Sequence, residues 1–306
     1  MPITRQSIVR GPGTVTFKGA TLFDASGITA EIDSSTQDIM SSIAGKLDTI
    51  KTDQIGKISL TPVGNLSNTL LDVLFPAYTR TPVIGQSVFG ETDSPLNIVA
   101  QAGKKVTFCS AALTKIPELY LSPVKTAFGA AEFTALLANG KSPVDSLGFY
   151  TVESFTYADG TPPRDGLSGF HYVGTYGDLE ITDTTEGWTV AVDAQLGAVT
   201  TDELGTIDYT LTGINVKAKC TPLGLSEEQI LAALPTSKSR GSSISGAHDL
   251  VISASGGLSV VLKKAALVTG PLNWGASALR AGEIGFTAHI DTTDGSLYSI
   301  SYSGVS

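Results

Sequence analysis

Apolar and polar residues alternate with a period of two along most of the chain, and turn-forming residues bound the alternating segments. This period puts every second side chain on one face of an extended strand, so it predicts strands with one buried face. Threonine is frequent in these segments, and its β-branched side chain suits a pleated surface. The clearest expected strands cover residues 15–18, 57–61, 189–193, 250–254 and 284–288.

Helical signals are confined to two short segments, residues 67–75 and residues 226–234, each followed by a proline. In the second segment Ser226 is placed to cap the first turn, and Gln229 stands three residues later as its capping-box partner. Neither segment is long enough to build a helical domain. The sequence therefore predicts an all-β fold with short flanking helices.

The chain also repeats itself weakly. A shift of 160 residues aligns Gly27 with Gly187 and Thr29 with Thr189. Differences in loop length account for a small drift of this shift farther along the chain, because surface loops tolerate insertions. Other matches, in the same order, are Asp33 with Asp193, Thr61 and Pro62 with Thr221 and Pro222, Pro76 with Pro235, Ala111 to Leu113 with Ala265 to Leu267, and Phe133 to Ala135 with Phe286 to Ala288.

These matches predict two tandem β-domains, residues 1–160 and residues 161–306, that arose by duplication. The turn-rich segment 159–166 is the expected junction. A length of 306 residues agrees with two domains of ordinary size. The alternative is a pair of unrelated β-domains of similar length.

Composition limits the possible functions. Charged residues make up 16% of the chain, compared with about 25% in typical soluble domains. We expect part of the surface to contact further copies, since a monomer normally uses charge to stay soluble. The net charge of −9 lacks the basic patch that nucleic-acid binding needs. We also expect no secretion signal and no membrane span, because no apolar stretch reaches about 20 residues.

Residues that carry out chemistry are sparse and scattered. His171, His248 and His289 lack metal-ligand spacing, and Cys109 and Cys220 are interpreted as buried apolar residues without a disulfide. A Ser-x-x-Lys sequence at Ser122 has no partner motifs. Gly140-Lys141-Ser142 lacks the first glycine of a phosphate loop. We therefore expect no catalytic residue, no cofactor and no metal, so the chain is not expected to be an enzyme.

The first half resembles the major tail tube proteins of bacteriophages with long, non-contractile tails (siphophages). The similar segments are residues 8–17, the helix that ends with Leu74, Phe75 and Pro76, and residues 106–117 and 121–136. The likeness covers residues 5–140 and reaches the second half through the internal repeat. It departs at residues 115–117, Lys-Ile-Pro, which become Thr-Gly-Pro at residues 269–271.

The resemblance implies two tandem tail-tube-type domains, each a β-sandwich or barrel with a flanking helix. It implies a structural virion protein of the phage tail, assembled in the host cytoplasm. Edge strands of its copies would pair into rings, and the rings would stack into a tube through which DNA passes without tight binding. A duplicated chain would need three copies to make a pseudo-hexameric ring. Further implied partners are the tape measure, tail tip and terminator proteins.

Two other functions remain open. A distal tail or tail-terminator protein of the same fold would cap a tube without polymerising. A carbohydrate-binding or hydrolytic β-domain is disfavoured, because only 7% of the residues are aromatic and the two tryptophans are far apart.

Contacts between rings are expected from two long loops, residues 34–50 and residues 195–207. The first loop has apolar residues at helix-like spacing, and its alternative interpretation is a short amphipathic helix packed on its own domain. The acidic balance has two interpretations as well: repulsion of DNA from the lumen, or ordinary surface charge. The candidate residues of the inter-ring interface are Asp38, Ile39, Met40, Ile43 and Leu47.

Overall fold

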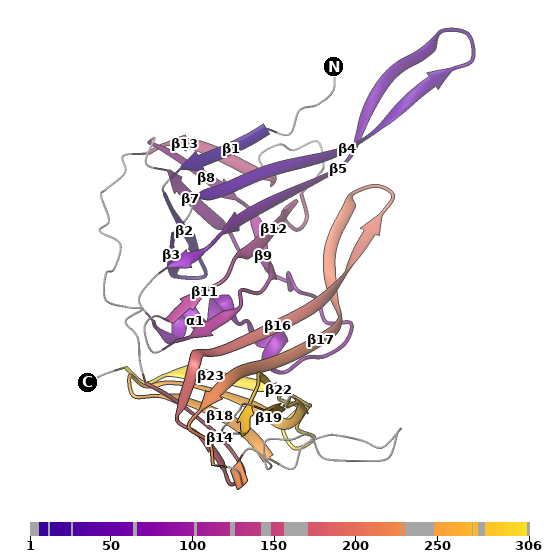
Figure 1. Cartoon of the computed structure of the whole chain (residues 1–306). Coiled ribbons are helices and arrows are strands. Elements are labelled where there is room, and N and C mark those ends of the chain that lie inside the picture. Colours follow the sequence, from indigo (N-terminus) through magenta and orange to yellow (C-terminus); the bar gives the residue numbers. More distant parts are fainter. Residues whose placement is uncertain are drawn as a thin grey trace.

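The structure is a computed structural model. It describes residues 6–11, 13–25, 27–63, 66–100, 103–122, 126–141, 148–155, 171–226, 228–229, 248–270, 272–274 and 279–304. This part of the chain is mostly strand with two short helices, which confirms the all-β expectation (Figure 1). All five of the clearest expected strands are present.

The first half of the chain is a sandwich of two antiparallel sheets. The rings of Phe17 and Phe133 meet edge to face between the sheets, 5.2 Å apart at their centroids. One sheet has the order β1 (Gln6–Gly11), β4 (Ile28–Ser41), β5 (Gly45–Leu60), β12 (Ala131–Leu136) and β9 (Ser110–Lys115). The other has the order β13 (Tyr150–Ser154), β8 (Lys104–Phe108), β7 (Leu96–Ala100), β2 (Gly13–Phe17), β3 (Ala20–Asp24) and β6 (Pro62–Val63).

The second half has two such layers joined by one bent strand. Two strands of the first half, β11 (Thr126–Phe128) and β10 (Leu119–Leu121), begin this sheet. The strands of the second half continue it in the order β16 (Asp183–Thr201), β17 (Gly205–Leu223), β22 (Ile284–Thr287), β19 (Leu258–Thr269), β18 (His248–Ala254), β14 (Tyr172–Tyr176) and β15 (Leu179–Ile181). β23 (Tyr298–Tyr302) also pairs with β19. β19 pairs with β18 and β23 up to Ala265 and with β22 from Ala266 on, and Lys264, next to this change of partner, has a positive φ of 43°.

Strand order and register are the same in the two halves. Ala30 pairs with Ile58 between β4 and β5, and Val190 pairs with Ala218 between β16 and β17, each 160 positions later. Four further pairs of the first half have a counterpart in the second. In the first half they are Phe133–Ile58, Phe133–Leu113, Ile98–Val106 and Val106–Val152. Their counterparts, in the same order, are Phe286–Ala218, Phe286–Leu267, Ile252–Val260 and Val260–Ile300. Equal register over so many strands follows from equal hydrophobic patterns, because a slip of one residue would turn every side chain to the other face.

The first predicted helix is confirmed, and it packs between the halves. α1 (Asn68–Leu74) begins at Ser67, whose side chain accepts a hydrogen bond of 3.1 Å from the Leu70 N–H, and α2 (Ala77–Arg80) follows Pro76. Phe75 contacts the ring of Tyr298 edge to face, and Thr79 shares a buried hydroxyl hydrogen bond of 2.7 Å with it. One connected core therefore runs through both halves.

Three predictions concern residues at or beyond the edge of the described parts. The capping box is present: the Gln229 N–H donates to Ser226 Oγ at 3.3 Å, and the Ser226 N–H donates to the Gln229 side chain at 2.9 Å. The rest of the predicted second helix and the junction at 159–166 lie outside the described residues. The division into domains 1–160 and 161–306 therefore stays a prediction.

The cysteines follow the sequence interpretation in part. Neither forms a disulfide, and Cys220 is buried as expected. Cys109 is only half-buried, which corrects the expectation, because it lies at the break between β8 and β9 where the backbone leaves one layer for the other.

Candidate functional site

The segment expected to be a long loop, residues 34–50, is instead the end of a long antiparallel hairpin. β4 and β5 pair as far as Ser41 and Gly45, and residues 42–44 form the turn. The alternative of an amphipathic helix is wrong as well. Two register shifts interrupt the hairpin, one between Ser35 and Thr36 and one between Ile39 and Met40, so its side chains do not follow a strict period of two. The hairpin projects beyond both sheets (Figure 1).

The tip of this hairpin carries exposed apolar side chains. Met40 is 67% exposed, Leu47 62% and Ile43, in the turn, 96%, while Ile39 and Ile50 are each about two-fifths exposed. Large apolar side chains grouped on a projecting element are typical of a surface that another protein covers. The structure thus brings all four apolar candidate residues to one tip.

Asp38, the fifth candidate residue, fixes the two strands of the tip. It accepts a hydrogen bond of 2.9 Å from Thr49 Oγ1 and forms an ion pair of 2.6 Å with Lys46. The hydrogen bonds from Lys46 and Thr49 hold the pKa of the Asp38 carboxyl below its ordinary value. Its role is local, since it joins β4 to β5.

The second expected loop, residues 195–207, is also the end of a hairpin, formed by β16 and β17 with a turn at 202–204. Unlike the first tip, it is anchored to the other half of the molecule. Asp53 of β5 accepts hydrogen bonds from the Thr206 N–H at 3.2 Å and from Thr206 Oγ1 at 2.8 Å. Gly205 has a positive φ of 70°, and a Cβ there would lie 2.6 Å from Asp53 Oδ1, so this position requires glycine.

A loop of the first half, residues 85–88, forms backbone hydrogen bonds with β17 of the same β16–β17 hairpin. Backbone hydrogen bonds join Gly85 and Gln86 to Leu211, at 2.8 and 3.0 Å, and join Val88 to Tyr209 at 2.8 Å. Val88 and Leu211 are buried in a small second core. These contacts hold the second hairpin on the body of the molecule.

Each half presents a polar face on the sheet that carries its hairpin. Along the central strands the buried residues alternate with partly or fully exposed ones, so one face packs on the core and the other meets solvent. Residues of the solvent face are Thr29, Glu31, Asp33, Lys57, Ser59, Thr114 and Glu132 in the first half and Thr189, Asp193, Asn215, Lys217, Lys219 and Thr287 in the second.

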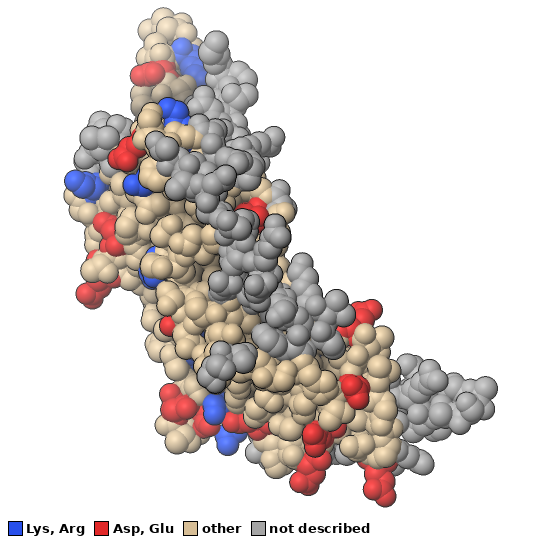
Figure 2. Space-filling model, turned by 90° about the vertical axis from the view of Figure 1, so that its left-hand side faces the viewer, with Lys and Arg blue, Asp and Glu red and all other residues tan. Residues whose placement is uncertain are grey.

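Charges of both signs lie on this polar face. Lys57 is 3.4 Å from Asp33, and Lys219 is 3.0 Å from Glu283. The excess of acidic residues is therefore not concentrated on the described part of this face. On the side of the molecule in Figure 2, acidic side chains gather at the end formed by the second half, and much of the described middle is uncharged.

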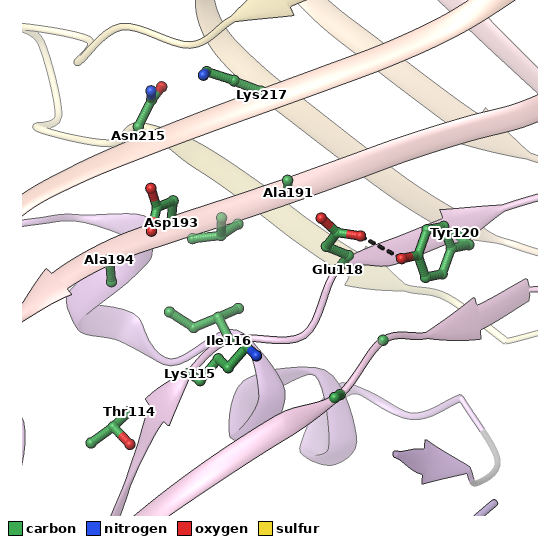
Figure 3. Close-up of a pocket in the computed structure, with 13 residues that line it drawn as sticks. Thr114, Lys115, Ile116, Glu118, Tyr120, Ala191, Asp193, Ala194, Asn215 and Lys217 are labelled. Atoms are coloured by element: carbon green, nitrogen blue, oxygen red, sulfur yellow. Dashed lines mark hydrogen bonds between the residues drawn. The ribbon is translucent and has the colours of Figure 1, made fainter. Parts of the chain in front are cut away.

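A groove of about 590 Å³ lies where the two polar faces meet (Figure 3). Residues of β9 and of the link to β10 form one side, and β16 and β17 supply Asp193, Asn215 and Lys217. In the groove Tyr120 donates a hydrogen bond to the Glu118 carboxylate, and this bond is the main cause that raises the pKa of the Tyr120 phenol.

The groove is open, and its titratable lining residues are Lys115, Glu118, Tyr120, Asp193 and Lys217. Over the described part of the chain no group of His, Cys, Asp and Glu could hold a metal ion. His289 Nδ1 lies 3.1 Å from the Lys264 carbonyl oxygen. In the sequence, His289 is far from both His171 and His248. No helix of the described residues has the length and apolar character to cross a membrane.

Sequence reasoning missed the groups that hold the halves together. Asp53, Thr206 and the strand β10 show no signal except the period-two pattern, because their partners are more than 60 residues away in the chain. The sequence signals nearest to these contacts are two glycines: Gly187 lies against the end of β10, and Gly205 lies against Asp53. Comparisons with known protein families and with curated protein sequences give no match for this chain.

Proposed function

We propose that this chain is the structural subunit of a siphophage tail tube, with two tube-type modules per chain. Three copies would form a pseudo-hexameric ring, and stacked rings would form the conduit for DNA. The proposal rests on the family resemblance of the first half together with the shared strand order and register of the two halves. It includes residence in the virion tail and no enzymatic activity.

The observation that carries the proposal is the pairing of β10 with β16. β9 forms the edge of the hairpin sheet in the first half, and the chain then continues through β10, which pairs along the edge of the corresponding sheet in the second half. Two sheets with polar outer faces are thereby joined side by side within one chain. Repeating this junction between chains would produce a closed ring of sheets with no free edge.

The polar faces would line the lumen, since the opposite faces are occupied by the core. A surface with paired charges of both signs and a chain with a net charge of −9 give DNA phosphates no continuous basic track. DNA would therefore pass without tight binding. The tape measure protein would occupy the same lumen before DNA does, and the tail tip and terminator proteins would cover the two ends.

The exposed tip of the β4–β5 hairpin would contact the next ring. Replacing Ile39, Met40, Ile43 and Leu47 together by serine is expected to leave the fold intact, because these side chains are exposed. Loss of their apolar contacts should uncouple ring stacking from ring formation. Electron microscopy of the purified variant should show separate rings where the unchanged chain gives tubes.

A control variant replaces the exposed Val83 and Ile84, which lie on a loop away from the tip, by serine. It should still form tubes. A chain that stays monomeric under all conditions, alone and with tail tips, would refute the proposal. Single rings that never stack, even with the unchanged tip, would favour the terminator or distal tail role.

A further inference from the structure

The contact between β10 and β16 has a specific geometry. Tyr120 pairs with Thr189, and Leu121 pairs with Trp188 in an antiparallel ladder. Gly187, which precedes Trp188 in β16, has a positive φ of 90°. A Cβ on it would lie 2.7 Å from the Ser122 Cα. Glycine at position 187 thus lets the end of β10 pass directly over the backbone.

The second half contains a hairpin that corresponds to β10 and β11. β20 (Leu272–Trp274) and β21 (Leu279–Ala281) form a two-stranded sheet of their own. Leu272 pairs with Ala281 and Trp274 with Leu279. Leu119 pairs with Phe128 and Leu121 with Thr126 in the first half, so both pairs are displaced by 153 positions.

The first half contains the edge that corresponds to β16. Thr29 and Ile28 of β4 occupy the positions of Thr189 and Trp188, and Gly27 corresponds to Gly187. Gly27 has the same left-handed conformation, with φ of 106°, but no described atom lies within 4 Å of the position of a Cβ. On this edge the chain's own strand β1 takes the place of β10, with Arg10 opposite Thr29.

From these matches we propose that β1 is a replaceable cap on β4, and that in the assembled ring the β20–β21 hairpin of a second copy takes its place. Asn273 of one copy then lies opposite Thr29 of the next, and Trp274 lies opposite Ile28. The proposal rests on the proposed ring function and specifies its junction between chains.

The exchange replaces one antiparallel strand by another on the same edge, so the β4 backbone groups opposite the new strand keep hydrogen-bond partners. Five residue pairs join β1 to β4 and three join β10 to β16, so contacts beyond this ladder must offset the difference in the ring. It also explains how the free chain avoids uncontrolled growth, since an open strand edge is a template for aggregation. Assembly would begin only when a neighbouring hairpin competes with β1 for β4.

Paired cysteines test the register. Directly opposite residues of an antiparallel pair are close enough for a disulfide. The variant Tyr120→Cys/Thr189→Cys is the positive control and should form its bond within one chain. The variant Asn273→Cys/Thr29→Cys should link neighbouring copies upon oxidation of assembled rings and give covalent species up to the trimer. Each single-cysteine variant controls for the native Cys109 and Cys220.

A second pair tests the cap. Arg10→Cys/Thr29→Cys should form a bond in the free chain that locks β1 on β4, with loss of assembly and full recovery after reduction. Assembly of the reduced variant shows that the substitutions leave the fold intact. Normal assembly of the locked chain would overturn the cap.

The two proposals fail in different ways. Rings or tubes of the Asn273→Cys/Thr29→Cys chain that give no link between copies would overturn the junction and leave the tube function standing. A native chain that never assembles would refute the tube function itself.

Discussion

At the scale of single residues, the two halves solve the same packing problem with different side chains. Val15 and Ile28 of the first half correspond by register to Gly174 and Trp188 of the second. Trp188 is fully buried, and its ring fills the space where a Cβ on Gly174 would stand, 2.7 Å from Cη2. The first half thus fills this space with two side chains of medium size, Val15 and Ile28. The second half fills it with the large Trp188 side chain beside a glycine, so both cores are filled.

This exchange leads to a prediction for Gly174→Ala. The added methyl group would overlap the Trp188 ring, and we expect a loss of about 1–3 kcal/mol in the free energy of unfolding, as is usual for overpacked cores. Gly285→Ala is the matched control, because a Cβ there meets Thr269 at an ordinary 3.4 Å. The midpoints of urea unfolding would measure both changes. Equal midpoints for the two variants would contradict this account of the packing.

A second prediction concerns the titration of Asp38 at the hairpin tip. Its pKa in the folded chain is lowered from the ordinary value of 3.8, so the pairing with Lys46 is intact above that value and is lost as the pH falls through the lower folded pKa. Carboxyl carbon NMR should show the Asp38 midpoint below 3.8. In Lys46→Gln the midpoint should rise, because the charged donor is gone. An unchanged midpoint in that variant would assign the shift to Thr49 instead.

At the scale of elements, the two long hairpins differ in support although their registers match. β16 and β17 are held by Asp53 and by the loop that contains Gly85 and Val88. The β4–β5 tip has no such contacts among the described residues and exposes its apolar side chains. The two hairpins touch at Asp53 of β5, so the second hairpin is held along its end, whereas the part of the first hairpin beyond Asp53 has no such anchor among the described residues.

The anchor at Asp53 gives a third prediction. Asp53→Ala removes the acceptor for the Thr206 N–H and hydroxyl and leaves the half-buried turn unsatisfied. Hydrogen exchange at Thr206 should accelerate, while exchange at Val190 in the core of the same hairpin should stay unchanged. Asp48→Ala, a change of an exposed carboxylate on the other tip, is the control. Unaltered protection of Thr206 would show that the loop at residues 85–88 holds the hairpin alone.

At the scale of the whole molecule, the halves are joined by more than the connecting segment. β10 lies in the second-half sheet, and Asn68 of α1 forms two hydrogen bonds, 3.0 and 2.9 Å, with the backbone of Tyr302. Thr79 and Tyr298 add a buried pair between the halves. These contacts should hold the two halves together in the native state even without the connecting segment.

The fourth prediction belongs to the whole molecule and concerns cleavage of the connecting segment. A protease site inserted between residues 156 and 170 would let the chain be cut after folding. The two fragments should elute together in size-exclusion chromatography without denaturant, because β10 and the shared core hold them. Addition of urea should separate them. Elution as two species in native buffer would mean that the halves are independent domains.

The local pattern in the sequence was sufficient for the strands and for the start of the first helix. Period-two alternation predicts strands around Ile58, Val190 and Ile252, because each alternate side chain must be buried on one face. Ser67 and Pro76 limit the helix through capping and a missing donor, which are effects of nearest neighbours. The repeat was also visible, since equivalent strands need equivalent apolar positions.

The pattern failed where long-range pairing decides the structure. Residues 34–50 contain polar and apolar residues in helix-like order, yet antiparallel pairing with a partner strand makes them a hairpin, with bulges that shift the register. Likewise nothing local indicates that β10 leaves its own half, or that Asp53 binds Thr206. The sequence by itself determined the strands, the helix cap and the repeated order of elements, because neighbouring residues control them. The tertiary structure alone decided which strand edges are covered and which hairpin tip is exposed, because only the folded chain brings those distant groups together.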